Sequence, residues 1–278
     1  MSHRVTVNNL PAWLDSPRLL GPGEWSFARG PEGQWVQATA TLSSEAAADL
    51  GARLRGIGLG GRRLVVACVP PLSRSKVRAA RTEDARRRRK TSPGMTRRGT
   101  RLDTQGRYSL TPELLALELG KRACRVHVVD AGCGSGGNTV GFARAGCRVT
   151  AIERDPSRAQ DARHNARCYE VADQISVITG SVEQVLATIE TDATRDILFV
   201  DPPWGREWDR HRIALESFEL LTTCLRARKK FAAVWAKLPP SSDVSTCLES
   251  HIEAVFGHQS GDSRRIKFVL VRFPGHPA

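Results

Sequence analysis

An apolar run passes directly into a glycine-rich turn in Val126-His127-Val128-Val129-Asp130-Ala131-Gly132-Cys133-Gly134-Ser135-Gly136-Gly137-Asn138. The run at residues 126–130 is typical of a strand that is buried in a parallel sheet. The glycines allow positive φ angles and a close approach of the backbone to a ligand, and a helix is expected over residues 139–144. This order of strand, tight turn and helix predicts the first unit of a doubly wound α/β sheet.

An acid at the end of this strand decides between two ligands for the turn. A dinucleotide fold uses a similar turn to place a pyrophosphate at a helix N-terminus. Asp130 would repel a pyrophosphate, whereas its carboxylate suits the ammonium group of a methionine moiety. The next strand, residues 149–152, ends in Glu153, which is placed to accept hydrogen bonds from two ribose hydroxyls, each worth about 1.5–3 kcal/mol. The pattern favours S-adenosyl-L-methionine as cofactor.

A second apolar run, residues 197–200, ends at Asp201-Pro202-Pro203-Trp204. Two prolines cannot donate to a sheet and each fixes its own φ, so the strand must end in a stiff corner. The Asp201 carboxylate and the Pro202 carbonyl are both acceptors, which suits a planar amino group with two protons to donate. Trp204 offers a face for a base ring. These residues resemble the (Asp/Asn/Ser)-Pro-Pro-(aromatic) signature of nucleobase amino-methyltransferases, although Asp and Pro are also common in surface loops.

Strands and helices alternate through the rest of the C-terminal part. Further helices are expected to begin after Thr111 as N-cap and Pro112 at the first position, and over residues 156–169, 182–189, 213–228 and 243–250. Further strands are expected over residues 175–179, 231–236, 252–256 and 266–273. The order predicts an α/β fold over residues 101–278, a doubly wound seven-stranded Rossmann-like sheet of the class I methyltransferase type. Its ligands should bind at the carboxyl ends of the strands.

Residues 1–72 have the order of a small β-α-β-β-α-β unit and weakly resemble an RNA-recognition motif. Strands are expected over residues 5–10, 34–42 and 62–69, and helices over residues 16–20 and 43–54. The central strands carry Thr6, Gln37 and Thr39 where such domains carry stacking aromatic residues. We therefore expect this α+β domain to pack on its neighbour or to contact the RNA backbone.

The positive charge lies mostly between these two parts. Residues 74–101 hold twelve Lys and Arg against two acids, which is +10 of the net charge of +13. We expect a basic linker over residues 73–100, with a helix from Lys76, that contacts RNA phosphates through residues 74–101. A solvated linker or a localisation signal has the same composition.

Composition limits the class of protein further. A pI near 10.1 indicates a polyanionic partner, with nucleic acid favoured over anionic lipid. The sequence contains no run of eighteen apolar residues and no signal-peptide pattern at its start, so neither a membrane span nor secretion is expected. The seven cysteines are scattered and never spaced Cys-x-x-Cys. They indicate reduced thiols, no metal site, and a cytoplasmic or nuclear protein. We also expect a monomer.

From Arg101 onward the chain resembles the trimethylguanosine synthase family, which methylates the guanine N2 amino group of a 7-methylguanosine RNA cap. The shared pieces are Leu102-Asp103, Tyr108-Ser109-Leu110-Thr111-Pro112-Glu113, Val129-Asp130-Ala131-x-Cys133-Gly134-x-Gly136-Gly137-Asn138-Thr139, Ala151-Ile152-Glu153-x-Asp155-Pro156 and Pro202-Pro203-Trp204-Gly205. Three positions depart from the family pattern: Asp201 replaces its Ser, Arg206 its second Gly, and Pro240-Ser241 its Arg-Asn.

The resemblance implies a role for each candidate residue. The catalytic group comprises Asp201, Pro202 and Trp204. The residues expected to hold S-adenosyl-L-methionine are Thr111, Asp130, Gly132, Gly134, Asn138, Glu153 and Ser181. The residues expected to contact the RNA substrate are Arg101, Trp204 and Arg206.

Three alternatives fit the same residues. The acceptors at Asp201 and Pro202 suit the N2 amino group of guanine and the N6 amino group of adenine equally, in ribosomal or transfer RNA as well as in a cap. From another class, the chain could be a non-catalytic RNA-binding protein that keeps a vestigial cofactor fold. The intact glycine turn, Asp130, Glu153 and Asp201 speak against that alternative.

Overall fold

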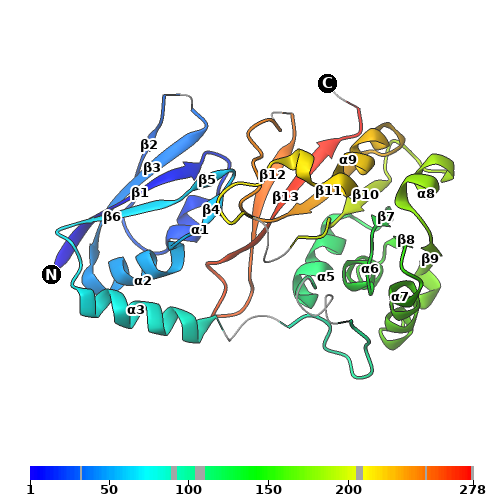
Figure 1. The fold of residues 1–278 in the computed structure, drawn as a ribbon, viewed down its shortest axis with the longest axis horizontal. Helices are drawn as coiled ribbons and strands as arrows, with labels where there is room; N and C mark the ends of the chain where they lie inside the picture. Colours follow the sequence, from blue (N-terminus) through cyan, green and yellow to red (C-terminus); the bar gives the residue numbers. More distant parts are fainter. Residues whose placement is uncertain (32, 89–92, 104–109, 205–208, 248, 277–278) are drawn as a thin grey trace.

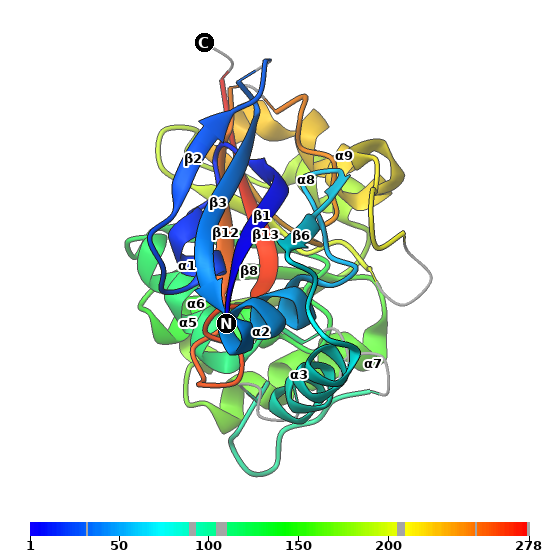
Figure 2. The same cartoon turned by 90° about the vertical axis from the view of Figure 1, so that its left-hand side faces the viewer.

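The computed structural model describes all of the chain except residues 32, 89–92, 104–109, 205–208, 248 and 277–278. It contains a four-stranded sheet in the N-terminal part and a seven-stranded sheet in the C-terminal part. The two parts lie side by side, with the N-terminal strands next to β12 and β13 of the large sheet (Figures 1 and 2). Among the described helices, none is long and apolar enough to cross a membrane.

The N-terminal unit has the strand order β2-β3-β1-β6 with antiparallel neighbours, as in a β-α-β-β-α-β fold. Val5 and Val7 alternate with polar residues, so one face of the sheet is buried beneath the helices. Thr6 and Thr39 are paired on the other face, which has the predicted small and polar character. The elements are β1 (Ser2–Pro11), α1 (Ser16–Leu20), β2 (Ser26–Arg29), β3 (Trp35–Ser43), α2 (Ser44–Leu54) and β6 (Val65–Val69).

A short hairpin interrupts the strand that was expected over residues 62–69. The strands β4 (Gly58–Leu59) and β5 (Arg62–Arg63) pair with each other, and β6 begins only at Val65. Gly60 and Gly61 have φ angles of 60° and 85°. Two successive residues with positive φ form the tight turn that reverses the chain here.

Part of the basic linker is a docked helix. The helix α3 (Arg74–Arg87) begins two residues before the predicted start, because Ser73 caps it by accepting a hydrogen bond from the Lys76 backbone nitrogen. It packs on α2, and its buried Asp84 forms ion pairs with Arg88 and with Arg265 of the large domain. The predicted helical extension through residues 89 and 90 lies outside the described residues.

The large sheet has the order β12-β13-β11-β10-β7-β8-β9. All neighbours are parallel except β13, which is antiparallel to β11 and β12. The prediction of a seven-stranded doubly wound α/β sheet is confirmed. Its strands are β7 (His127–Ala131), β8 (Arg148–Glu153), β9 (Ile175–Thr179), β10 (Ile197–Val200), β11 (Ala233–Leu238), β12 (His251–Phe256) and β13 (Ile266–Pro274). Its α-helices are α5 (Glu113–Arg122), α6 (Gly137–Arg144), α7 (Pro156–Cys168), α8 (Val182–Thr188) and α9 (Glu219–Arg226).

Three sequence predictions about helices were wrong. Pro112, not Thr111, is the N-cap of α5, and no side chain caps this helix. The helix expected over residues 213–228 is only α9, preceded by a 3-10 turn at Leu215–Ser217 and followed by another at Arg228–Lys230. The described part of residues 243–250 forms turns instead of a helix.

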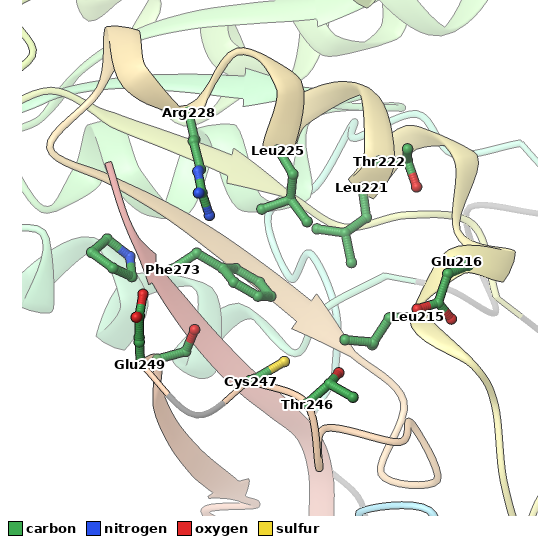
Figure 3. A pocket seen from close by; sticks show the side chains of 12 residues that line it. Leu215, Glu216, Leu221, Thr222, Leu225, Arg228, Thr246, Cys247, Glu249 and Phe273 are labelled. Carbon is green, nitrogen blue, oxygen red and sulfur yellow. The ribbon is translucent and has the colours of Figure 1, made fainter. Parts of the chain in front are cut away.

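A cavity of about 430 Å³ lies between these turns, α9 and Phe273 of β13 (Figure 3).

Each face of the large sheet is buried in a different way. One face packs against α5, α6 and the C-terminal end of α7, with Phe142 and Phe199 in edge-to-face contact. The other packs against α8, α9 and the N-terminal unit, in one continuous apolar cluster that runs from Val5 to Phe273. The N-terminal unit therefore shares its core with the large domain.

Candidate active site

A cleft of about 1560 Å³ lies at the carboxyl ends of β7, β8, β10 and β11, where a doubly wound sheet binds its ligands. Most of the candidate residues line it: Thr111, Gly132, Gly134, Asn138, Glu153, Ser181, Asp201, Pro202 and Trp204. Asp130 is buried beside it. Arg101 is exposed and does not line this cleft, and Arg206 lies outside the described residues. The binding roles of all these residues stay predictions.

The glycine turn brings the end of β8 to the floor of the cleft. Gly134 has a φ of 55°, and a side chain added there would enter open space inside the cleft. Its backbone nitrogen donates to Glu153 Oε2 at 2.8 Å, and the Asp155 nitrogen donates to Glu153 Oε1 at 2.9 Å. Both carboxylate oxygens of Glu153 are thereby fixed in position, and each keeps a lone pair for a further donor.

Asp130 is a buried carboxyl group with one free oxygen. Its Oδ2 accepts a hydrogen bond from Thr139 Oγ1 at 2.5 Å, while its Oδ1 has no partner among the described residues. Burial raises the pKa of Asp130 to about 7; the Thr139 hydrogen bond opposes this shift, and the charges of Asp201 and Glu153 add to it. Such a group stabilises a cation that arrives next to it.

Asp201 is held by three donors from three different parts of the fold. Its Oδ2 accepts hydrogen bonds from Asn138 Nδ2 at 3.1 Å and from Lys237 Nζ at 2.5 Å. Its Oδ1 accepts one from the indole nitrogen of Trp204 at 3.2 Å. Asn138 is the second residue of α6, directly after the glycine turn, so this hydrogen bond joins the predicted cofactor loop to the diproline corner.

Lys237 is the residue of this site that the sequence analysis missed. Its side chain is only 3% exposed, and its Nζ lies 5.3 Å from the ring centre of Trp204 and 5.5 Å from that of Phe268. The strand was expected to end at Ala236, whereas β11 continues to Leu238 and carries Lys237 into the cleft. A lysine that continues an apolar strand was the available signal, because buried lysines require a partner.

The cysteines and the other metal-ligand types are the remaining reactive side chains. All seven cysteines are free thiols. Burial raises the pKa of Cys133, in the glycine turn, well above its ordinary value, so this thiol stays protonated. Within the described residues, no group of three or more His, Cys, Asp or Glu side chains is placed to hold a metal ion.

Comparison with known proteins adds a family to this geometry. The model of a family described as RNA cap guanine-N2 methyltransferase matches residues 125–268, which is half of the chain. The chain belongs to this family. The strand order of the large sheet, with its antiparallel β13 between β11 and β12, is accordingly that of a class I methyltransferase.

Individual relatives of this family member match over shorter stretches. It is 34% identical to the trimethylguanosine synthase of Schizosaccharomyces pombe over 113 residues, covering 38% of this chain and 47% of the relative. It is 31% identical to that of Saccharomyces cerevisiae over 104 residues, covering 35% and 33%. The chain thus spans less than half the length of these curated relatives. A crystal structure of an S-adenosylmethionine-dependent methyltransferase from Agrobacterium tumefaciens is similar, with a TM-score of 0.47 and 14% identity over 64% of this chain and 66% of that one.

S-adenosyl-L-methionine is the cofactor of this methyltransferase fold, and the cleft fits it. Four buried polar atoms around the glycine turn have no partner among the described residues: Thr111 Oγ1, Asp130 Oδ1, Ser135 Oγ and Asn138 Oδ1. Unpaired buried polar atoms are costly, so a ligand rich in donors and acceptors would satisfy them. Asp130 would hold the ammonium group, and Glu153 the ribose hydroxyls.

Proposed function

We propose that this chain transfers a methyl group from S-adenosyl-L-methionine to the exocyclic N2 amino group of guanine in RNA, with a 7-methylguanosine cap as its first candidate substrate. Membership in the cap methyltransferase family supports the RNA and the guanine. The observation that carries the chemistry is the Asp201 carboxylate, hydrogen-bonded to the cofactor loop through Asn138 and seated next to Trp204.

Asp201 would act mainly by orienting the amino group. A carboxylate has roughly four acceptor sites, and Asn138, Lys237 and Trp204 occupy three of them. One site remains to accept an N–H of the substrate, and the Pro202 carbonyl is the candidate acceptor for the other. The exocyclic amine is a weak nucleophile because its lone pair is delocalised into the ring. Two acceptors in the plane of the base turn that lone pair toward the methyl group, which the bound cofactor would supply as its C–S bond breaks. The methylated nitrogen must then lose a proton, and Asp201 is the candidate acceptor for it.

Trp204 would provide the stacking surface for the guanine. Its indole is fixed by its hydrogen bond to Asp201 and by the ammonium group of Lys237 near its ring. A 7-methylguanosine carries a positive charge, which favours stacking on an aromatic face. Pro202 and Pro203 each have a fixed φ, and Pro202 is also buried. The corner between the strand and the indole therefore has little freedom to move.

The first test is the Asp201→Ala variant with a capped RNA, and mass spectrometry of the nucleosides locates the methyl group. We expect kcat for N2 methylation to fall by about 10²–10⁴-fold, with little change in cofactor affinity. Asp173→Ala, in the 3-10 turn Ala172–Gln174 before β9, is the matched control at the opposite edge of the sheet. Unchanged N2 methylation in the Asp201 variant would remove the carboxylate from the mechanism.

A second substrate distinguishes methylation of the guanine amino group from methylation of the adenine amino group. Adenine N6 methylation remains the rival activity, because Asp201, in place of the family's serine, is the acid of the broader amino-methyltransferase signature. Inosine has no N2 amino group, so an RNA with inosine at the target guanine should accept no methyl group. Transfer to adenines of this RNA would support the rival, and failure of calorimetry to detect S-adenosyl-L-methionine binding would support the non-catalytic scaffold.

A further inference from the structure

The hairpin of β4 and β5 is hydrogen-bonded to the two loops that follow the cleft residues Trp204 and Lys237. The Gly58 nitrogen donates to the Arg210 carbonyl at 3.1 Å, in the loop that follows Trp204. The Gly60 nitrogen donates to the Pro240 carbonyl at 2.9 Å, in the loop that follows Lys237. The hairpin of the N-terminal unit is therefore a neighbour of the cleft. Figure 1 shows β4 and β5 at the side of their unit that faces the large domain.

Three arginines lie at this junction. Arg62 and Arg63 form β5, and Arg210 lines the cleft itself. All three are exposed, and within the described residues no carboxylate lies within ion-pair distance of them. The guanidinium group of Arg62 lies 4.4 Å from the ring centre of Trp35, which fixes its direction. We call Arg62, Arg63 and Arg210 the basic rim.

The basic linker differs from the rim because its helix uses much of its charge within the protein. On α3, Lys76 pairs with Glu45, and Arg87 pairs with Asp49 and Glu83. Arg88, at the end of this helix, pairs with the buried Asp84. These contacts attach the helix to α2 and to the large domain. Their charges are already compensated, so they have less to gain from a phosphate than the basic rim has.

We propose that the basic rim binds the phosphate backbone of the single-stranded RNA that flanks the target guanine. The inference rests on the proposed function for the identity of the substrate. A base held at Trp204 has its chain leaving the cleft past Arg210, whose backbone is bonded to the hairpin that carries Arg62 and Arg63. Arginine side chains bind phosphate oxygens through charge-assisted hydrogen bonds without reading sequence. The N-terminal unit thus contacts RNA through its hairpin, while the open face of its sheet lacks stacking residues on its paired central positions Thr6 and Thr39.

The test compares two variants of the full-length chain that lose the same charge. Arg62→Ala/Arg63→Ala removes the hairpin part of the rim. Arg78→Ala/Arg81→Ala removes two exposed arginines of α3 that make no ion pair among the described residues. Binding of a short 3′-labelled, capped single-stranded RNA is measured by fluorescence anisotropy over a range of salt concentrations. KM and kcat are measured with this RNA and with a cap dinucleotide that has no flanking chain.

The rim variant should bind the RNA more weakly, and the magnitude of the negative slope of log K against log salt should fall by about 1.4, or 0.7 for each lost phosphate contact. Its KM should rise for the RNA and stay unchanged for the dinucleotide, with kcat unchanged for both. The α3 variant should keep the slope of the unmodified protein. An equal fall of the slope in both variants would overturn the proposal, as would an unchanged slope in the rim variant.

Two further outcomes separate this proposal from the proposed function. RNA binding that depends on the rim, without methyl transfer to any RNA, would contradict the guanine methylation and leave the rim supported. Methyl transfer with the same KM for the RNA in the rim variant would support the guanine methylation and contradict the proposal for the rim. Arg63→Glu is the additional variant if the double alanine variant unfolds, because the Arg63 side chain is exposed and its charge reversal should weaken RNA binding further.

Discussion

Asp201 must be held rigidly if it is to orient an amino group as proposed. Asn138, Lys237 and Trp204 hold it in place by donating to its two oxygens. Lys237 matters most, because it is the one cation among these three donors and its side chain is almost completely buried.

Replacing Lys237 by Met should destabilise the protein. The variant leaves the Asp201 carboxylate, 16% exposed, without its counter-charge, and breaking a pair buried in this way costs about 3–5 kcal/mol. The double variant Lys237→Met/Asp201→Asn removes both charges and should recover part of that loss. The free energy of unfolding in urea measures both. A single variant as stable as the unmodified chain would show that the pair does not hold the site together.

The pKa of Asp130 predicts a pH dependence of cofactor binding. Burial raises this pKa from 3.8 to about 7, so the folded protein without cofactor keeps a proton that the unfolded chain loses. The contribution of this group to stability is therefore complete below the ordinary pKa and is lost as the pH rises through 7. An ammonium group binds the ionised form, so affinity for S-adenosyl-L-methionine should increase as the pH crosses 7 from below. Calorimetry on both sides of that pH measures the increase. Asp130→Asn should bind weakly and without this pH dependence.

Several residues of the site follow from local sequence. Asp130, Glu153 and Asp201 each stand at the end of a recognisable apolar strand, and parallel strands bring such ends to one edge. Lys237 did not follow, because its place depends on how far β11 continues. The contact between Asn138 and Asp201 joins residues 63 positions apart, and no periodicity encodes it.

The hairpin of β4 and β5 shows what could not be predicted at the scale of elements. Residues 62–69 have the composition of one strand, but the turn at Gly60 and Gly61 pairs β5 with β4, and Leu64 separates β5 from β6. In the described part of residues 243–250, turns replace the expected helix, because the backbone there bonds to neighbouring loops. The Asp243 nitrogen donates to the Ile213 carbonyl at 2.8 Å, for example. Tertiary contacts of this kind override local propensity.

Gly58→Ala should disturb the loop that follows Trp204 and carries Arg210, while leaving the glycine turn intact. An added Cβ would lie 2.4 Å from the Arg210 carbonyl oxygen and 2.6 Å from the His211 Cα, so the backbone of that loop must move. We expect KM for RNA to rise and kcat to fall, with unchanged affinity for S-adenosyl-L-methionine. Gly51→Ala is the matched control, because its Cβ on α2 meets no atom within 4 Å. It should be neutral or add roughly 0.5–1 kcal/mol to stability. Equal kinetics for the two variants would contradict a positioning role for the hairpin.

At the scale of the whole molecule, the N-terminal unit completes the large domain. A doubly wound sheet needs both faces covered. On the second face α8 and α9 cover one part, and the described chain between β11 and β12 supplies no further helix. Residues such as Leu19 and Leu59 belong instead to the same apolar cluster as Leu238 and Phe256. The guanidinium group of Arg53 adds a polar contact between the two parts, with Nη1 donating to the Arg264 carbonyl at 3.4 Å. The division of the chain at residues 72 and 100 stays a prediction, but these contacts argue against two independent domains.

A fragment of residues 101–278 should therefore fail to fold as a stable unit. Without residues 1–100 it loses the N-terminal members of the shared apolar cluster, such as Leu19, Leu50 and Leu59, and burial of a side chain of this size contributes about 1.5–3 kcal/mol. It also loses the ion pair of Arg265 with Asp84. We expect the fragment to aggregate, or to melt at a lower temperature without binding S-adenosyl-L-methionine, whereas the full chain should unfold in one transition that the cofactor shifts upward. Calorimetric scans with and without cofactor measure both. A fragment that melts cooperatively at the temperature of the full chain and still binds the cofactor would mean that the shared core is dispensable, and that the N-terminal unit serves RNA alone.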